Sequence, residues 1–173
     1  MKIIAFLLFL IISPIVILIS ICLFFYSSEK PKILFKQNRI GFYQKEFTIY
    51  KFKTMENDQV TKLGKYLRKG GLDEIPQLIN IIKGEMSFIG PRPLTIDDIK
   101  RLKWTDKIHQ KRWHVKPGIT GIAQLQNTCS ADLSLSNDIK YVENKSLSLD
   151  LRIFARSILI PILGKKALND RIS

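Results

Sequence analysis

The feature that most constrains this chain is an uncharged apolar run near its N-terminus, from Ile3 to Tyr26. As a straight helix, these 24 residues would be roughly 36 Å long, which is enough to cross the hydrocarbon core of a membrane. No small-x-small cleavage site follows the run, which argues against a cleaved signal peptide. We therefore expect a membrane anchor over residues 1–28.

Ser13 and Pro14 interrupt this run near its middle. Pro14 has no N–H to donate to the carbonyl of Leu10, and the Ser13 hydroxyl can satisfy a carbonyl freed nearby. Each arm of about a dozen residues is roughly 17 Å long, so it reaches the middle of a bilayer and no further. Two interpretations stay open from the residues alone: a kinked helix that spans the membrane, and a re-entrant helix that turns back at Ser13-Pro14.

The rest of the chain, residues 29–173, is strongly basic. The whole chain has a formal net charge of +13; all 15 acidic residues lie at or beyond Glu29, and Lys2 is the one basic residue before it. This excess favours polyanionic partners such as anionic lipid headgroups, phosphorylated substrates or nucleic acid, without choosing among them. Two cysteines do not indicate a disulfide framework, and no Gly-rich loop ends in Gly-Lys-Ser/Thr, which excludes a P-loop. The length fits one domain plus the anchor.

Hydrophobic spacing predicts a small β-hairpin, two short helices and a longer C-terminal helix in this body. The hairpin is expected over residues 33–39 and 47–53, with Gly41 in the turn. A helix over 61–68 should stop at Gly70-Gly71, and a second over 75–83 should end at Gly84, with Leu78, Ile79 and Ile82 as its apolar face. We expect an α+β, mostly helical fold.

The C-terminal stretch 147–168 has apolar residues at helical spacing, mixed with arginines and lysines. A helix of this pattern lies on a membrane surface or packs against the core, and the sequence leaves both alternatives open. Its apolar residues are Leu151, Phe154, Ile158, Leu159 and Ile162.

Asp73 and Glu74 stand side by side at the expected start of the second short helix, with Pro76 in its first turn. Two acidic residues at a helix N-terminus can simply cap it. They also form the pair that phosphoryl chemistry needs, a carboxylate nucleophile beside a metal-binding carboxylate, and a helix N-terminus would help to keep Asp73 ionised. Arg68, just before the pair, favours a site over a cap.

Two rigid loops follow. In Ser87–Pro93, Pro91 and Pro93 restrict the backbone around Arg92 and leave its guanidinium little freedom to lose, which suits phosphate recognition. In Lys116–Gly121, small residues allow close approach of a phosphate or sugar, although an ordinary tight turn has the same composition.

These segments together resemble the bacterial sugar transferase family, the small monotopic phosphoglycosyl transferases that begin glycan assembly on polyprenol phosphate. The resemblance extends from Ser13-Pro14 to about Ile158. Its motifs occur in this order: Phe35-Lys-Gln-x-Arg-Ile-Gly41, Tyr50-Lys-Phe-Lys-Thr-Met55, Leu67-Arg68, Leu72-Asp-Glu-x-Pro-Gln-Leu78, Gly84-Glu-Met-Ser-Phe-Ile-Gly-Pro-Arg-Pro93, Val115-Lys-Pro-Gly-Ile-Thr-Gly121, Tyr141-Val142 and Leu149-Asp-Leu-Arg152.

The resemblance implies a re-entrant anchor, with residues 29–173 as a catalytic domain on the cytoplasmic face of the bacterial inner membrane and helices packed at the membrane surface. It implies transfer of a sugar-1-phosphate from a UDP-sugar to polyprenol (undecaprenyl) phosphate, with release of UMP, as the first membrane step of glycan synthesis. Asp73 would be the nucleophile that forms a phospho-aspartate, and Glu74 would bind Mg²⁺.

The same resemblance suggests partners and further site residues. The partners would be the UDP-sugar, polyprenol phosphate, anionic membrane lipid and downstream glycosyltransferases, with no nucleic acid expected. The substrate-binding candidates are Arg68, Arg92, Lys116, Gly118 and Thr120.

One departure from the family pattern keeps an alternative function open. After Gly121 the family tends to show Gln-Val-x-Gly-Arg, whereas residues 124–128 here read Gln-Leu-Gln-Asn-Thr and lack both Gly and Arg. The alternative is a catalytically weak relative that acts as a membrane-tethered scaffold or basic binding module.

Overall fold

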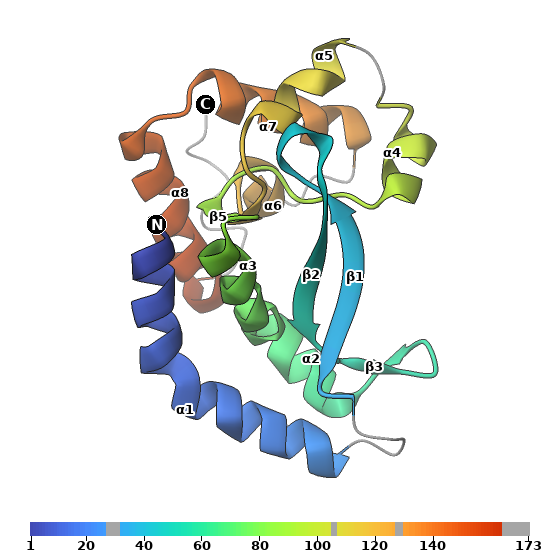
Figure 1. Cartoon of the computed structure of the whole chain (residues 1–173), viewed down its shortest axis with the longest axis vertical. Coiled ribbons are helices and arrows are strands. Elements are labelled where there is room, and N and C mark those ends of the chain that lie inside the picture. The colour runs from blue at the N-terminus through green and yellow to red at the C-terminus, as the bar shows by residue number, and fades with distance from the viewer. Residues whose placement is uncertain (27–31, 105–106, 127–129, 164–173) are drawn as a thin grey trace. The chain divides into compact units, whose positions relative to one another are not determined.

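The computed structural model describes residues 1–26, 32–104, 107–126 and 130–163 (Figure 1). The chain is mostly helical with small pairs of strands, so the expected α+β class is confirmed. It divides into two compact units, one formed by Met1–Gln37 with Thr48–Gly84, the other by Asn38–Phe47 with Glu85–Ser173. The division into a membrane anchor, residues 1–28, and a catalytic domain, residues 29–173, stays a prediction.

The first unit begins with α1 (Lys2–Tyr26), which contains Pro14 and bends partway along its length (Figure 1). Ser13 Oγ donates a hydrogen bond to the Leu10 carbonyl at 2.8 Å. Pro14 has no N–H to donate to that carbonyl, so the prediction that the Ser13 hydroxyl satisfies a carbonyl freed by Pro14 is confirmed. The bend therefore leaves no lost hydrogen bond at this carbonyl.

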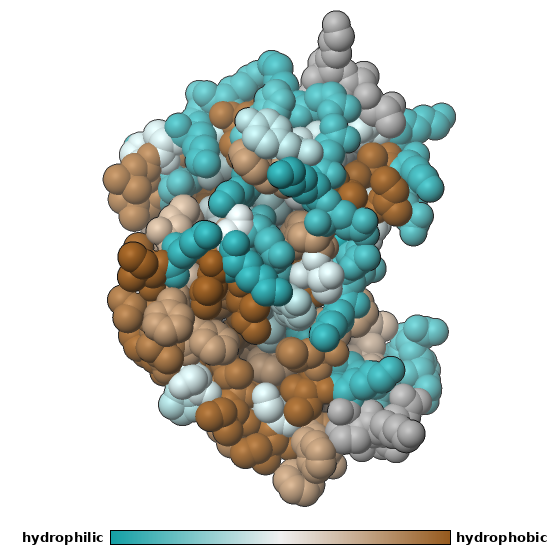
Figure 2. All heavy atoms as spheres, viewed as in Figure 1, coloured by the Kyte–Doolittle hydropathy of each residue, from teal (hydrophilic) through white to brown (hydrophobic). Residues whose placement is uncertain are grey.

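Most of α1 is exposed. Ile19 and Leu23 pack with Phe52 and Leu67, while large apolar side chains along the remainder face outward (Figure 2). Within the described residues, α1 is the helix long and apolar enough to cross a membrane, and 11% of its most apolar window is buried. A core helix of a soluble protein would be mostly buried, so the exposure of α1 favours contact with an apolar surrounding.

The predicted β-hairpin is confirmed as β1 (Leu34–Ile40) and β2 (Glu46–Phe52), joined through the 3₁₀ turn η1 (Phe42–Gln44). A second hairpin that the sequence reasoning missed follows, with β3 (Met55–Glu56) paired to β4 (Gln59–Val60). Its two turn residues, Asn57 and Asp58, both have positive φ. Asn and Asp are the residues that tolerate this backbone in a two-residue hairpin turn, so the signal was present.

The helix expected over 61–68 is α2 (Lys62–Lys69). Thr61 caps it, since its side chain accepts a hydrogen bond from the Gly64 N–H at 2.9 Å. The chain leaves the helix at Gly70 and turns at Gly71, whose φ is 67°. The predicted stop at the two glycines is confirmed.

The helix expected over 75–83 is only partly correct. Residues Leu72–Gln77 form a 3₁₀ helix, η2, and the α-helix α3 covers Leu78–Lys83, ending at Gly84 with φ 84°. The expected apolar face was also wrong in part, because Asn80 and Ile81 are the deepest residues of α3. Asn80 turns inward because its amide binds the β2 backbone, donating to Thr48 O at 2.7 Å and accepting from Tyr50 N at 3.3 Å.

The second unit contains a parallel pair of short strands where two loops were expected. β5 (Ser87–Ile89) pairs with β6 (Gly118–Thr120), with Ser87 opposite Gly118 and Ile89 opposite Thr120. The helices of this unit are α4 (Ile96–Leu102), α5 (Lys107–Gln110), the 3₁₀ helix η3 (Lys111–His114), α6 (Ile122–Gln126), α7 (Ala131–Glu143) and α8 (Leu147–Leu163).

The core of this unit joins β5 to α6, α7 and α8 through Ile89, Ile122, Leu125, Tyr141 and Ile153. The Tyr141 hydroxyl lies 2.8 Å from Asp150 Oδ1 and 3.2 Å from the Ile89 carbonyl oxygen, which ties α7 to α8 and β5. Tyr141 and Asp150 belong to the two late motifs of the sequence, which therefore have a packing role.

The exposed side of α8 carries the apolar residues that the sequence reasoning singled out. Leu151, Phe154, Ile158 and Leu159 are exposed, whereas Ile153 is the residue that enters the core. Those four side chains do not pack in the core. Ile162 lies in α8 without a described side chain, and 164–168 lie outside the described residues.

Candidate functional site

The acidic pair lies in the first turn of η2, directly after the left-handed residue Gly71. Asp73 and Glu74 are both partly buried. Gly71 occupies the N-cap position and makes no side-chain cap hydrogen bond, so neither acidic residue is the N-cap of η2, although both lie in its first turn, where acidic residues are favoured.

Glu74 is held by a lysine from the hairpin. Lys51 Nζ on β2 lies 2.5 Å from Glu74 Oε1, and the two side chains are 18% and 26% exposed. Partial burial reduces screening by water, so this ion pair is stronger than an ordinary surface pair. The sequence analysis placed Lys51 only within the second strand of the hairpin and did not connect it with the acidic pair. Strand signals are local and do not indicate which distant residue a side chain will meet.

Arg68, predicted to lie at the site, is anchored by Thr54. Its Nε donates to Thr54 Oγ1 at 2.9 Å, and Thr54 is buried at 4% exposure. The rest of the Arg68 side chain is exposed. The hydrogen bond fixes one edge of the guanidinium and leaves the other edge available to an anion.

The pKa of Asp73 is raised from its ordinary value, mainly because burial disfavours the charged carboxylate and next because Glu74 repels it. Lys51 and Arg68 act in the opposite direction, as does a hydrogen bond from the backbone N–H of Asp73 itself. The expected help from the helix N-terminus is present in this backbone hydrogen bond, but burial and Glu74 outweigh it. A six-residue 3₁₀ helix offers little dipole, and two cations supply the compensation.

The residues present fit a divalent cation that shares its ligands with a substrate. Magnesium in phosphate-transfer sites takes one or two carboxylates and completes its shell with water and phosphate oxygens. Asp73 and Glu74 offer two adjacent carboxylates, and Lys51 engages one oxygen of Glu74. Among the described residues, no group of three or more His, Cys, Asp or Glu could hold a metal alone. A magnesium site here would need the phosphates of a substrate.

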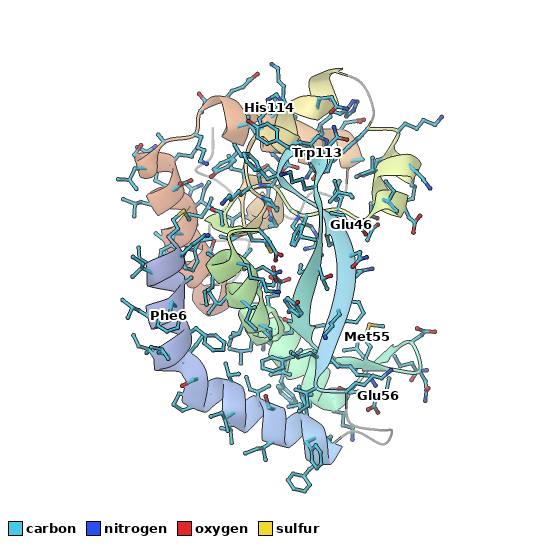
Figure 3. All side chains as sticks on the ribbon, viewed as in Figure 1. Phe6, Glu46, Met55, Glu56, Trp113 and His114 are labelled. Carbon is cyan, nitrogen blue, oxygen red and sulfur yellow. The ribbon has the colours of Figure 1, made fainter. Side chains whose placement is uncertain are left out.

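The other predicted residues lie in the second unit. Arg92 is exposed between the buried residues Pro91 and Pro93, and its carbonyl oxygen accepts a hydrogen bond from Arg112 Nη2 at 2.9 Å. Arg112 and its neighbours Trp113 and His114 belong to η3 (Figure 3). The loop thus presents the Arg92 side chain outward on a fixed backbone, as its two prolines predict.

In the loop 116–121, packing alone explains the presence of Gly118 and Thr120. A Cβ on Gly118 would lie 2.1 Å from the backbone nitrogen of Gly90, so glycine is required where β5 and β6 approach. Thr120 Oγ1 lies 2.7 Å from Ser157 Oγ on α8. Lys116 is partly buried. A substrate role for Lys116, Gly118 and Thr120 stays a prediction.

The structure therefore brings Asp73, Glu74 and Arg68 together in the first unit and adds Lys51 and Thr54 to them. Burial, two cations and two adjacent carboxylates with a perturbed pKa are typical of a functional site. The chain belongs to the bacterial sugar transferase family, whose model matches residues 2–164. The resemblance inferred from the motifs is confirmed.

The chain is similar to several curated bacterial proteins. It is 40% identical over 140 residues to "Uncharacterized sugar transferase EpsL" of Bacillus subtilis (strain 168), which covers 73% of this chain and 68% of that protein. It is 32% identical over 182 residues to "UDP-glucose:undecaprenyl-phosphate glucose-1-phosphate transferase" of Klebsiella pneumoniae, covering 93% of this chain and 39% of that protein.

A third relative is "UDP-N-acetylgalactosamine-undecaprenyl-phosphate N-acetylgalactosaminephosphotransferase" of Aeromonas hydrophila, 34% identical over 151 residues, covering 76% of this chain and 36% of that protein. The matches thus span about two thirds of the first relative and less than half of the other two.

Replacing Asp73 by Asn should raise the free energy of unfolding at neutral pH by roughly 0.5–1 kcal/mol, because the amide removes a half-buried charge that solvent screens only in part. The folded pKa of Asp73 lies above its ordinary value of 3.8. The native state therefore binds this proton more tightly, and the wild type loses stability as the pH rises through that window.

Urea unfolding in one detergent across the acidic and neutral range measures the difference. The advantage of the Asp73→Asn variant should be largest above the folded pKa and should disappear towards pH 3.8. Asp58→Asn, in an exposed turn, is the matched control and should leave stability unchanged. An Asp73→Asn variant less stable than the wild type at neutral pH would contradict this account.

Proposed function

We propose that this chain transfers a sugar-1-phosphate from a UDP-sugar to polyprenol phosphate, in bacteria undecaprenyl phosphate, and releases UMP as the first membrane step of glycan synthesis. Family membership and the names of two relatives, both undecaprenyl-phosphate sugar phosphotransferases, support this reaction class. The observation that carries the proposal is Asp73, a partly buried carboxylate of raised pKa with Glu74, Lys51 and Arg68 around it. A helix cap would need none of these cations.

The proposed reaction has two displacements at one phosphorus atom. An Asp73 carboxylate oxygen attacks the sugar-linked phosphorus, the bond to the UMP oxygen breaks, and UMP leaves with that electron pair. An oxygen of polyprenol phosphate then attacks the same phosphorus and releases the Asp73 carboxylate. The sugar phosphate passes to the lipid, and Asp73 returns to its starting state.

The neighbours of Asp73 have separate tasks in this scheme. Lys51 and Arg68 favour the ionised, nucleophilic form of Asp73 against burial and against Glu74. Arg68, fixed by Thr54 through its Nε, can bind phosphate oxygens as negative charge moves to the leaving group. Glu74, with Asp73 beside it, would hold Mg²⁺, which when bound supplies charge neutralisation for the diphosphate.

The membrane arrangement is part of the proposal. We propose that α1 enters and leaves the same face of the bacterial inner membrane, bending at Ser13-Pro14, with the catalytic body on the cytoplasmic side. The exposed apolar surface of α1 and the satisfied Leu10 carbonyl at the bend support this topology. The exposed apolar side of α8, beside Arg152, suits a membrane surface that carries anionic lipid.

Incubating the enzyme with UDP-sugars in the absence of lipid acceptor should produce one UMP per active enzyme and a sugar-phosphate adduct on Asp73, detected by mass spectrometry after an acid quench. Asp73→Asn should lower turnover by at least about a thousandfold while the protein stays folded and membrane-bound. Turnover at the wild-type rate in this variant would end the assignment. A folded wild type that forms no adduct and releases no UMP from any UDP-sugar would favour the scaffold alternative.

Replacing Lys51 by Met should move the acidic limb of the kcat/KM profile to higher pH. The cation lowers the pKa of Asp73, so its removal raises that pKa and leaves less of the ionised nucleophile at a given pH. Lys65→Met, on the exposed side of α2, removes the same charge and should leave the limb in place. An unmoved limb in Lys51→Met would show that Lys51 does not tune Asp73.

Cysteine labelling tests the topology. In a variant with both native cysteines replaced by Ser, a cysteine at position 2 and one at position 65 should react with a membrane-impermeant maleimide from the same side, in inverted vesicles and not in intact spheroplasts. A spanning helix would give opposite sides for the two positions.

A further inference from the structure

A buried asparagine lies in α3 at a position where an apolar side chain could pack. Asn80 is 0% exposed, and its neighbours Leu78 and Ile81 are buried apolar residues of the same helix. Burying a carboxamide is unfavourable unless its polar atoms are hydrogen-bonded, and those bonds require one particular geometry. Asn80 therefore contributes something at this position that a leucine could not supply.

The hydrogen bonds of Asn80 go to the backbone of β2. Its Nδ2 donates to Thr48 O at 2.7 Å, and its Oδ1 accepts from Tyr50 N at 3.3 Å. Successive residues of a strand direct their backbone groups to opposite edges, so Thr48 and Tyr50 share one edge. Lys53, at an odd-numbered position, donates its N–H to Ile33 O on the side of β1. The Asn80 carboxamide therefore binds the edge away from β1, where it replaces a neighbouring strand.

A second contact joins the same two segments of the chain. Lys51 follows Tyr50 in β2, and its Nζ lies 2.5 Å from Glu74 Oε1 in η2, which continues directly into α3. A slip of β2 by one residue would turn Lys51 to the opposite face of the strand. The two Asn80 bonds oppose this slip, because they fix which residues of β2 lie beside α3.

We propose that Asn80 is a positioning residue for the acidic pair, and that it holds Lys51 against Glu74 by fixing β2 at Thr48 and Tyr50. Its carboxamide is fully buried, so it acts through Lys51 and not on a substrate. Resting on the proposed function, the consequence reaches the nucleophile, because Lys51 favours the ionised form of Asp73.

Acylation of lysines measures the ion pair without any turnover. The full-length protein in detergent is treated briefly with a small amine-reactive ester, and the modification of each lysine is quantified by mass spectrometry. The Lys51 amine is protected while it is bound to Glu74. Asn80→Ala should raise the rate at Lys51 at least about threefold, within the range expected for a partly exposed ion pair. The rate at the exposed Lys65 should stay unchanged.

The pH dependence of kcat/KM tests the consequence for the nucleophile. Asn80→Ala should move the acidic limb to higher pH, and by no more than Lys51→Met does, because both changes withdraw the same cation from Asp73. In the Lys51→Met background, Asn80→Ala should move the limb no further. An equal movement in both backgrounds would show that Asn80 acts independently of Lys51 and would overturn the proposal.

Asn137→Ala is the matched control. Asn137 on α7 is 6% exposed and donates a hydrogen bond to Gln126 Oε1 in the second unit. Its replacement should lower stability, as loss of a buried hydrogen bond does, and leave both the acylation of Lys51 and the acidic limb unchanged. If circular dichroism shows that Asn80→Ala does not fold, the same two measurements are made on Asn80→Ser, whose shorter hydroxyl can satisfy one backbone group of β2 without fixing both.

The two readouts separate this proposal from the proposed function. An unchanged acylation rate at Lys51 in a folded Asn80 variant would overturn the positioning role, even in an active transferase. A protein in which the Asn80 variant exposes Lys51, but which releases no UMP from any UDP-sugar, would refute the proposed function alone.

Discussion

Two adjacent carboxylates repel each other, and the first unit has to hold both of them partly buried. Burial and Glu74 each make Asp73 harder to ionise, while Lys51 and Arg68 make it easier. The strand β2 supplies Lys51 to Glu74, and the buried Thr54 orients Arg68. The hairpin, α2 and η2 thus supply the charged groups that surround Asp73. A partly buried carboxylate whose pKa is set by opposing charges is more typical of a nucleophile than of a helix cap.

In the N-terminal helix α1, a side-chain hydrogen bond replaces a missing backbone hydrogen bond, and this permits the bend. Pro14 removes the donor for the Leu10 carbonyl, and the neighbouring Ser13 hydroxyl replaces it. The helix continues through the bend without an unsatisfied group there, which an apolar surrounding would not tolerate. Ile19 and Leu23 tie the helix to the first unit, and most of its other apolar side chains stay outside.

The two loops of the second unit, 87–93 and 116–121, contain glycines that packing requires and an exposed arginine, Arg92. Gly90 and Gly118 allow two backbones to approach where any side chain would clash, so the small residues that suggest a ligand loop are needed by the strand pair itself. Behind Arg92, the buried Arg112 fixes the loop backbone and is fixed in turn by Asp138 and two tryptophans. The loop backbone that carries the exposed Arg92 side chain is therefore held by residues that no loop motif contains.

The sequence by itself determined the features that depend on near neighbours: the apolar helix with its Ser13–Leu10 bond, the hairpin, the glycine stops after α2 and α3, and the acidic pair with its family. Capping, turn and strand signals act over a few residues, so they can be read along the chain. Only the tertiary structure decided that Lys51 meets Glu74, 23 residues away, and that Arg112 meets Asp138, 26 residues away. It also decided that β5 pairs with β6 and that Asn80, not Ile79 or Ile82, turns inward. Which distant segments meet depends on the packing of the whole unit, and no local pattern encodes the partner of a buried charge.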